Sequence, residues 1–260
     1  MTWPAGSEWE RPGAGGGGGG GTPARVDPDS YDILVWHDWD GTLPWASSGT
    51  NALELDAKVG DVLRGMGTFG GGVPAPYPLS YASGGGLLRS PASSNVGESQ
   101  TMTASGWVWI PQLPDSAVLC GLFLKRDTEG AWDSPYSPWG FYVSENGSLV
   151  VAVRLDDGSD TQVVLQSDAG SMPAGLHHVG FTLDDQVLTA YLDGQVAEGT
   201  VPTDLGHDIA FYGHGPYLLG GFLNNTTAFY SGGWADDVRV ASVVRASSWF
   251  ADVWASRRTT

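Results

Sequence analysis

Apolar and polar residues alternate with a period of two along most of the chain after Tyr31, most clearly between Gly175 and Gln195. In HHVGFTL, and again in VLTAYL, every second side chain is apolar, which is the pattern of a strand with one face in the core. The pairs Asp184-Asp185 and Asp193-Gly194 follow these runs, and such residues tolerate the positive φ angles of tight turns. The segment therefore predicts two short strands, each closed by a hairpin turn.

The same kind of pattern recurs through the rest of the chain. Further short strands are predicted in YDILVWHDW, LLRSPAS, TMTASGWVWI, VLCGLFLKR, WGFYVSEN, SLVVAVRL and TQVVLQS, with Gly or Pro in most of the gaps. Many short strands with regular turns favour a sandwich or a jelly roll over alternating strand and helix units. Only SSWFADVWAS, near the carboxyl end, has apolar residues at a helical spacing, so it predicts a short closing helix.

Four of these segments carry a family resemblance. TMTASGWVWI, WGFYVSENGSLVVAVRL with its turn at Asn146-Gly147, the His-His hairpin from Gly175, and GGWADDVRVASVVRA occur in the order found in the laminin-G-like, concanavalin A-like lectin/glucanase domains. Residues 30 to about 256 resemble that family. The resemblance implies an all-β fold, a two-sheet antiparallel jelly-roll sandwich, and places one domain at residues 30–260. A fold of this kind does not fix an activity.

Residues 1–29 predict a flexible arm ahead of that domain. Gly15 to Gly21 is an unbroken glycine run between prolines, and such a segment is too polar and too entropic to fold alone. Trp3 and Trp9 are unusual in a mere linker, and two aromatic side chains could anchor the arm in a groove on a neighbouring subunit. The alternative is a disordered tail with incidental tryptophans.

Composition limits the classes of partner. The formal net charge is -17 and the sequence pI is about 4.3, so a phosphate backbone would be repelled and nucleic acid is not expected as a partner. No segment approaches the roughly 20 apolar residues of a membrane span, so we expect no membrane insertion. Cys120 is the only cysteine, which excludes an internal disulfide and a cysteine zinc cluster.

Catalytic motifs are missing from the sequence. Glucanases that share this sandwich carry two carboxylates on one strand face as E-x-D-x-E, because retaining hydrolysis needs carboxyl groups about 5 to 5.5 Å apart. The chain has no such triplet, and Asp156-Asp157 and Asp184-Asp185 fall in predicted turns. We therefore expect no enzyme activity, with an atypical glycan-cleaving enzyme as a minor alternative.

The adjacent His177 and His178 suggest a structural role. Adjacent residues on a strand point to opposite faces, so these two imidazoles cannot bind one metal ion together. One of them is expected to be packed and hydrogen-bonded, as the family resemblance also implies.

Calcium is the metal that the resemblance makes a candidate. In relatives, an Asp of the D-D-V-R motif meets oxygens near the start of the domain, where this chain has Asp38 and Asp40. Asp38, Asp40 and Asp236 are thus candidate ligands of a Ca²⁺ ion, which prefers hard oxygen donors. The alternative is that Asp236 caps a turn and that Asp237 pairs with Arg239.

An aromatic loop offers a candidate ligand site. Trp132, Asp133, Tyr136 and Trp139 lie in DTEGAWDSPYSPWG, a stretch longer than a hairpin needs. Aromatic rings beside carboxylates suit sugars, whose C–H faces stack on the rings while the acids accept hydrogen bonds from hydroxyls. The alternative is that these rings pack against a neighbouring subunit or against the base of the loop.

We therefore expect a non-catalytic structural or adhesion protein of a tailed-phage virion, on the tail or the capsid surface. The amino terminus MTWPAGSEWERPG has no export signal although the fold is typical of extracellular proteins, so release by lysis within a particle would reconcile the two. Its partners would be other virion structural proteins, further copies of itself and, for attachment, a host surface glycan. It would assemble in the host cytoplasm and be released extracellularly. The alternative is a free bacterial carbohydrate-binding module.

Overall fold

The structure is a computed structural model that describes most of the predicted jelly roll. The described residues are 29–36, 45–51, 53–55, 57–64, 67–69, 73–75, 79–91, 96–110, 113–114, 120–126, 137–159, 161–211, 215–224, 227–230 and 234–258. Residues 1–28 lie outside these ranges, so Trp3, Trp9 and the arm prediction are outside the described residues.

The described residues form twenty strands and one helix. In chain order these are β1 (Asp32–Trp36), β2 (Trp45–Ala46), β3 (Glu54–Leu55), β4 (Ala57–Arg64), β5 (Gly67–Phe69), β6 (Val73–Ala75), β7 (Leu79–Arg89), β8 (Thr101–Ile110), β9 (Cys120–Lys125), β10 (Trp139–Val143), β11 (Leu149–Arg154), β12 (Gln162–Gln166), β13 (Gly175–Asp184), β14 (Val187–Leu192), β15 (Gln195–Val196), β16 (Thr203–Asp204), β17 (Tyr217–Leu219), β18 (Gly221–Asn224), β19 (Thr227–Tyr230), β20 (Trp234–Ala241) and α1 (Ser247–Arg258).

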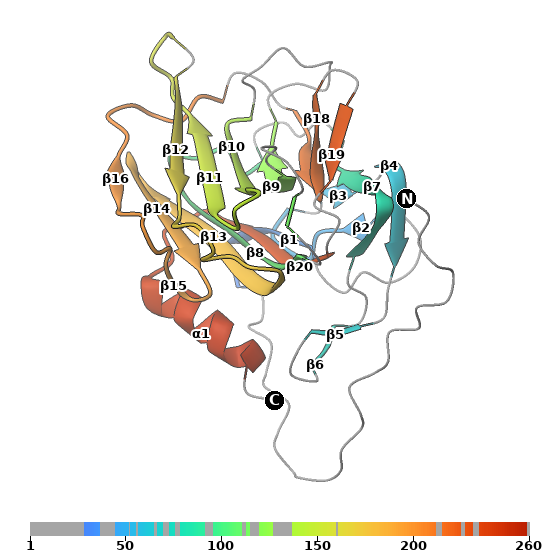
Figure 1. The fold of residues 1–260 in the computed structure, drawn as a ribbon. Helices are drawn as coiled ribbons and strands as arrows, with labels where there is room; N and C mark the ends of the chain where they lie inside the picture. The colour runs from blue at the N-terminus through green and yellow to red at the C-terminus, as the bar shows by residue number, and fades with distance from the viewer. Residues whose placement is uncertain are drawn as a thin grey trace.

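The strands form a sandwich of two antiparallel layers joined by one long strand (Figure 1). The hydrogen-bonded order is β12-β11-β10-β9-β17-β7-β20-β8-β13-β14-β15, and β7 pairs with β17 through its last residues and with β20 through its first. Six strand spacings separate β10 from β13 along this path, which is roughly 29 Å on a flat sheet. The rings of Phe141 and Phe181 on these two strands are only 5.3 Å apart, so the path folds back on itself. The predicted two-sheet antiparallel sandwich is confirmed.

The core lies between the two layers and follows from the strand register. Pairing places apolar side chains in one row across β7, β17, β9, β10 and β11, namely Leu88, Leu219, Phe123, Phe141 and Val151. All of them are buried, and alternation directs every second residue of each strand to this face. Such burial contributes about 1.5 to 3 kcal/mol for each large apolar side chain.

The turns form where the sequence predicts them. Asp185, with a φ of 57°, lies between β13 and β14, while Asp193 and Gly194 have φ angles of 52° and 83° between β14 and β15. Gly147, with a φ of 73°, lies in the turn that joins β10 to β11. These residue types adopt left-handed backbone at little steric cost, and that preference sets the register of the hairpins.

Helix α1 lies on the outside of the sandwich, beside β15 (Figure 1). Phe250 stacks on Tyr191 of β14 at 3.9 Å between ring centroids, and Trp254 stacks on Trp107 of β8 at 5.4 Å. Glycine at position 180 makes room for this packing, because a Cβ there would lie 2.4 Å from Phe250. The predicted closing helix is confirmed. Within the described part of the chain, no helix has the length and apolar content that a membrane crossing requires.

Candidate functional site

The His-His segment is a structural lock that joins β13 to the turn after β14. Nδ1 of His177 lies 2.9 Å from Oδ2 of Asp193, and its Nε2 lies 2.8 Å from the carbonyl oxygen of Pro173. The main-chain N–H of His178 donates to Oδ1 of Asp193 at 2.9 Å. The ring of His178 lies 5.1 Å from that of Trp107, which packs beneath α1. The predicted structural role is confirmed, because both nitrogens of His177 face oxygen acceptors and His178 packs among rings.

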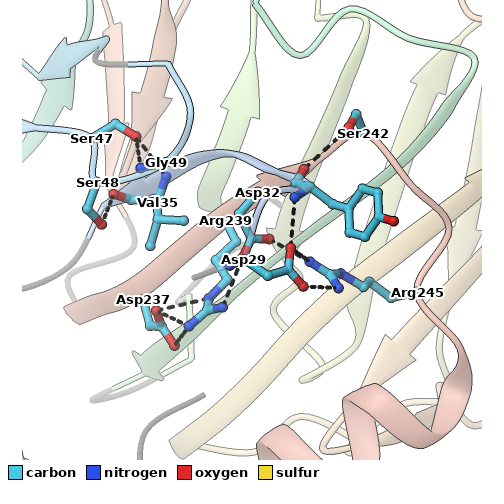
Figure 2. A network of polar contacts seen from close by, with 11 residues as sticks. Asp29, Asp32, Val35, Ser47, Ser48, Gly49, Asp237, Arg239, Ser242 and Arg245 are labelled. Carbon is cyan, nitrogen blue, oxygen red and sulfur yellow. Dashed lines mark hydrogen bonds and ion pairs between the residues drawn. The ribbon is translucent and has the colours of Figure 1, made fainter. Parts of the chain in front are cut away.

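A network of carboxylates and guanidinium groups joins the start of the domain to its closing strand (Figure 2). Arg239 of β20 donates to both carboxylate oxygens of Asp237 at 3.1 Å, and its Nη1 donates to Oδ2 of Asp32 at 3.2 Å. Arg245 donates to both oxygens of Asp29 at 2.7 and 2.8 Å, and to Oδ1 of Asp32 at 3.0 Å. Two arginines thus neutralise most of the charge of three carboxylates.

This network of Asp29, Asp32, Asp237, Arg239 and Arg245, called the clamp below, is largely buried. Asp32, Asp237 and Arg239 are each less than 5% exposed, so their charges depend on one another for compensation. Asp237 adopts a φ of 50° at an irregularity in the pairing of β20 with β8. The hydrogen bonds from Arg245 lower the pKa of Asp29 to about 2, and Asp29 in turn raises the pKa of Arg245. The ion pair of Asp29 with Arg245 is therefore formed near neutral pH.

The clamp occupies the region where the calcium prediction places one of its alternatives, the pairing of Asp237 with Arg239. A guanidinium group lies between Asp32 and Asp237, so the expected alternative in which Asp237 pairs with Arg239 is confirmed. Asp38 and Asp40 are outside the described residues, and of Asp236 only the main chain is described, opposite Trp107. Among the residues described, no group of three or more His, Cys, Asp or Glu side chains could hold a metal ion. A calcium site at Asp38, Asp40 and Asp236 stays a prediction.

The predicted ligand loop lies in the sequence between Arg126 and Ser137, which are the described residues on either side of it. Its residues Trp132, Asp133 and Tyr136 are outside the described residues. Trp139 is described and is fully buried in the core, contrary to the expectation that it faces a ligand. The reason is register: Trp139 pairs with Lys125 and Val153, and alternation turns its ring inward, 5.4 Å from that of Phe181.

The base of this loop contains buried cations, a feature that the sequence analysis missed. Nζ of Lys125 donates to the carbonyl of Gly215 at 2.5 Å, lies 3.3 Å from Oε1 of Glu98, and sits 4.9 Å from the ring centroid of Tyr217. Burial raises the pKa of Tyr217, and the negative charge of Glu98 raises it further. The only signal in the sequence was the Lys-Arg pair that ends an otherwise apolar strand.

Two arginines lie one position further along the same end of the sheet. The main-chain N–H of Arg126 donates to Pro216 and that of Arg154 to Pro138, each at 2.9 Å, and both side chains are buried. The strand ends on either side of residues 127–136 therefore carry three buried cations, in a chain that has 12 lysines and arginines in all. Rigid strand ends that position a variable loop are a common arrangement of binding sites.

Comparison with known proteins identifies the fold family. The family model Laminin_G_3, described as the concanavalin A-like lectin/glucanases superfamily, matches residues 83–249. No curated protein matches this chain.

Several solved structures share the fold at low sequence identity. The binding domain of Paraclostridial Mosquitocidal Protein 1 superposes with a TM-score of 0.61 at 12% identity, over 86% of this chain and 52% of that one. The binding domain of botulinum neurotoxin DC in complex with SialylT gives a TM-score of 0.58 at 14% identity, over 87% and 52%. Botulinum neurotoxin type C, described as dependent on interaction with two ganglioside molecules for cell entry, gives 0.60 at 12%, over 87% and 51%. These likenesses show a shared fold, and this chain spans about half the length of each.

Proposed function

We propose that this chain, which belongs to the concanavalin A-like lectin/glucanases superfamily, is a non-catalytic binding protein that recognises a surface glycan through the loop 127–136. The similar structures support a binding role, since two of them are binding domains, one of these in complex with SialylT, and cell entry of the third toxin depends on interaction with two ganglioside molecules. The proposal concerns this domain alone, because those chains are about twice as long.

The observation that carries the proposal is that the strand ends flanking this loop are fixed by buried side chains. The loop joins Arg126 to Ser137 at adjacent strand ends, and its base is fixed by the buried side chains of Lys125 and Arg154. Strand ends held by buried side chains fix the two points from which the loop is presented, which is a common arrangement of binding sites. Trp132 and Tyr136 supply rings that can stack on the C–H face of a sugar, and Asp133 supplies an acceptor for its hydroxyls.

The test is glycan-array binding by the wild-type chain, followed by titration of each hit with single variants. Trp132→Ala and Tyr136→Ala are expected to weaken binding by about tenfold or more, since loss of one stacked ring removes on the order of 1.5 kcal/mol. Tyr31→Ala is a matched control, because Tyr31 is 53% exposed and lies on a different segment. Binding that is unaffected by both loop variants would refute the proposed site.

Cleavage of the glycan is the minor alternative, since the superfamily includes glucanases. A binding protein releases its glycan unchanged, whereas an enzyme would produce new reducing ends. Incubation of the chain with each glycan hit and assay for reducing ends separates the two. Turnover that one Asp or Glu substitution abolishes would establish the enzyme.

Placement on a tailed-phage particle stays a prediction, as does the role of Trp3 and Trp9 in attaching the arm to a neighbouring subunit. Mass spectrometry of purified virus particles and of the particle-free supernatant tests it, with VASVVR and ASSWFADVWASR as diagnostic peptides. Stoichiometric recovery with particles would support a virion adhesion protein. Recovery only in the supernatant would favour a free bacterial carbohydrate-binding module.

A further inference from the structure

Strand β12 is an uncharged edge in a strongly acidic protein. It ends the hydrogen-bonded path of the sheet and pairs with β11 alone among the described strands. The segment TQVVLQS, from Thr161 to Ser167, has no charged residue and no proline, although the chain carries a net charge of -17. Val164, at its centre, is 47% exposed. Edge strands are commonly protected by charge or proline, because their free N–H and C=O groups can pair with another strand.

The hydrogen bonds to β11 show which groups of β12 face outward. Ser167 donates its N–H to Leu149, and Thr161 accepts from the N–H of Leu155, each at 2.9 Å. In an antiparallel pair, alternate residues direct both main-chain groups to the same neighbour. Odd-numbered positions of β12 therefore bond to β11, and the main-chain groups of Gln162, Val164 and Gln166 face the open edge.

The sequence of this edge is self-complementary. When two copies of TQVVLQS run antiparallel about a two-fold axis at Val164, Gln162 faces Gln166, Val163 faces Leu165, and Val164 faces its own counterpart. The outward groups of one copy then meet the outward groups of the other, as an antiparallel ladder requires. If the two-fold axis instead lay between two adjacent residues, the outward main-chain groups of one copy would face groups of the other copy that are already bonded to β11.

We propose that two copies of this chain associate through β12, so that the sheet continues from one copy into the next. Such a contact is isologous, because the same surface serves both partners. Like side chains of similar size face each other along the whole segment, which is what a two-fold interface demands. The uncharged edge also lets two acidic chains approach at a place where neither presents a charge.

The structure limits the contact to this short segment. The main-chain N–H of Asp168 donates to the carbonyl of Glu198 at 2.8 Å, so the open edge ends at Ser167. Further extension of the ladder would bring Asp168 of one copy toward Asp160 of the other, and two carboxylates would face each other. Because the remaining charges of the two copies repel, added salt is expected to strengthen the dimer.

The test is sedimentation velocity of the full chain over a concentration series, with two double variants that create repelling and attracting charge pairs between the copies. Gln162→Lys/Gln166→Lys sets like charges against each other twice across the two-fold axis, whereas Gln162→Lys/Gln166→Glu sets opposite charges against each other. The first should raise the dimer dissociation constant about tenfold or more over that of the second, since cross-strand charge pairs either repel or attract. It should do so although it lowers the net negative charge of the chain.

The matched control is Val187→Lys/Val196→Lys, which adds the same two charges at exposed positions on β14 and β15. It should dimerise at least as well as the wild type. Far-ultraviolet circular dichroism confirms the fold of each variant. A wild-type chain that stays monomeric at its highest attainable concentration, or equal dissociation constants for the two edge variants, would overturn the proposal.

Hydrogen exchange on the wild type keeps the proposal testable if a variant fails to fold. The outward amides of Gln162, Val164 and Gln166 should exchange more slowly as protein concentration rises, while amides that bond to β11 should change less. Exchange at these three amides that is independent of concentration would also overturn the proposal.

Discussion

The carboxylate of Asp193, in the turn after β14, is hydrogen-bonded to the imidazole of His177 on β13. Nδ1 of His177 lies 2.9 Å from Oδ2 of Asp193, whose Oδ1 accepts from the main-chain N–H of His178 at 2.9 Å. The carboxylate that makes the hairpin turn possible therefore also fixes the start of β13. The position of the His pair and the conformation of the Asp-Gly turn thus stabilise each other.

Asp193→Ala should lower the free energy of unfolding by about 2 to 3 kcal/mol, because it removes two hydrogen bonds and places Ala in left-handed backbone. Asp193→Asn should cost less, since an amide oxygen can still accept from His178 and Asn tolerates a φ of 52°. Urea denaturation measures both. Asp185→Ala is the control for the backbone alone, because Asp185 has a φ of 57° and an exposed side chain. Equal losses for Asp193→Ala and Asp185→Ala would mean that the hydrogen bonds contribute nothing.

Among the arginines of the clamp, Arg239 should be the one whose substitution lowers the free energy of unfolding most. Arg239→Met leaves the carboxylate of Asp237 buried without its bidentate partner, which should cost about 3 to 5 kcal/mol of stability. Arg245→Met should cost less, because Asp29 has a side chain that is 45% exposed and Asp32 keeps its bond to Arg239. Chemical denaturation of both variants gives the comparison. The reverse order would show that the interaction with Asp29 dominates the clamp.

The clamp also predicts a dependence of stability on pH. Arg245 holds the pKa of Asp29 at about 2, below its ordinary value of 3.8, so the ionised form is favoured in the folded state. The stabilisation from Asp29 is therefore fully present above about pH 4 and is lost as the pH falls toward 2. The stability difference between wild type and Asp29→Asn should stay below about 1 kcal/mol, because the side chain is partly exposed, and should shrink between about pH 4 and pH 2. A difference that grows on acidification would contradict the assignment.

Local features of the sequence were sufficient to predict β1, β8 to β14 and the hairpin turns among them, whereas β2 to β6 and β15 to β19 were not predicted. The alternation in 175–195, the Asn146-Gly147 turn and the spacing of Trp249 to Trp254 depend on interactions between near neighbours, and the structure contains each of these elements. Short-range patterns of this kind follow from steric preferences that the chain carries wherever it folds.

Side-chain partners that are distant in the sequence could not be predicted, because they depend on register between distant strands. Arg239 and Asp32 are 207 residues apart, and Lys125 and Gly215 are 90 apart. The inward direction of Trp139 likewise follows from its pairing with β9 and β11, whereas the residues just before it in the sequence are polar residues and prolines. An aromatic residue at the end of a loop can therefore belong either to the surface or to the core, and pairing alone decides which.

Lys125 should stabilise the loop base through its contact with Glu98. Both side chains are less than 8% exposed, and Nζ of Lys125 lies 3.3 Å from Oε1 of Glu98. Lys125→Met should cost about 3 to 5 kcal/mol, because it leaves a buried carboxylate without this cation. Lys125→Met/Glu98→Gln should recover part of that loss. If the two changes are additive in thermal or urea unfolding, the pair has no mutual interaction.

Gly180 should be needed for space under helix α1. A Cβ at this position would lie 2.4 Å from Cε1 of Phe250 and 3.2 Å from the carbonyl oxygen of Ala104, so Gly180→Ala forces Phe250 to move. Overpacking of this kind typically costs 1 to 3 kcal/mol, about as much as a lost buried contact.

Phe250→Leu gives the compensating change for that clash, because a smaller side chain leaves room above position 180. By itself it should also destabilise the protein, since it removes the stacking of Phe250 on Tyr191 at 3.9 Å. Gly180→Ala/Phe250→Leu should therefore lose less stability than the sum of the two single variants, by about 0.5 kcal/mol or more in urea denaturation. Near-ultraviolet circular dichroism should report the change in aromatic packing in Gly180→Ala. Strict additivity would mean that α1 does not pack over Gly180, because two residues without contact do not change each other's effect.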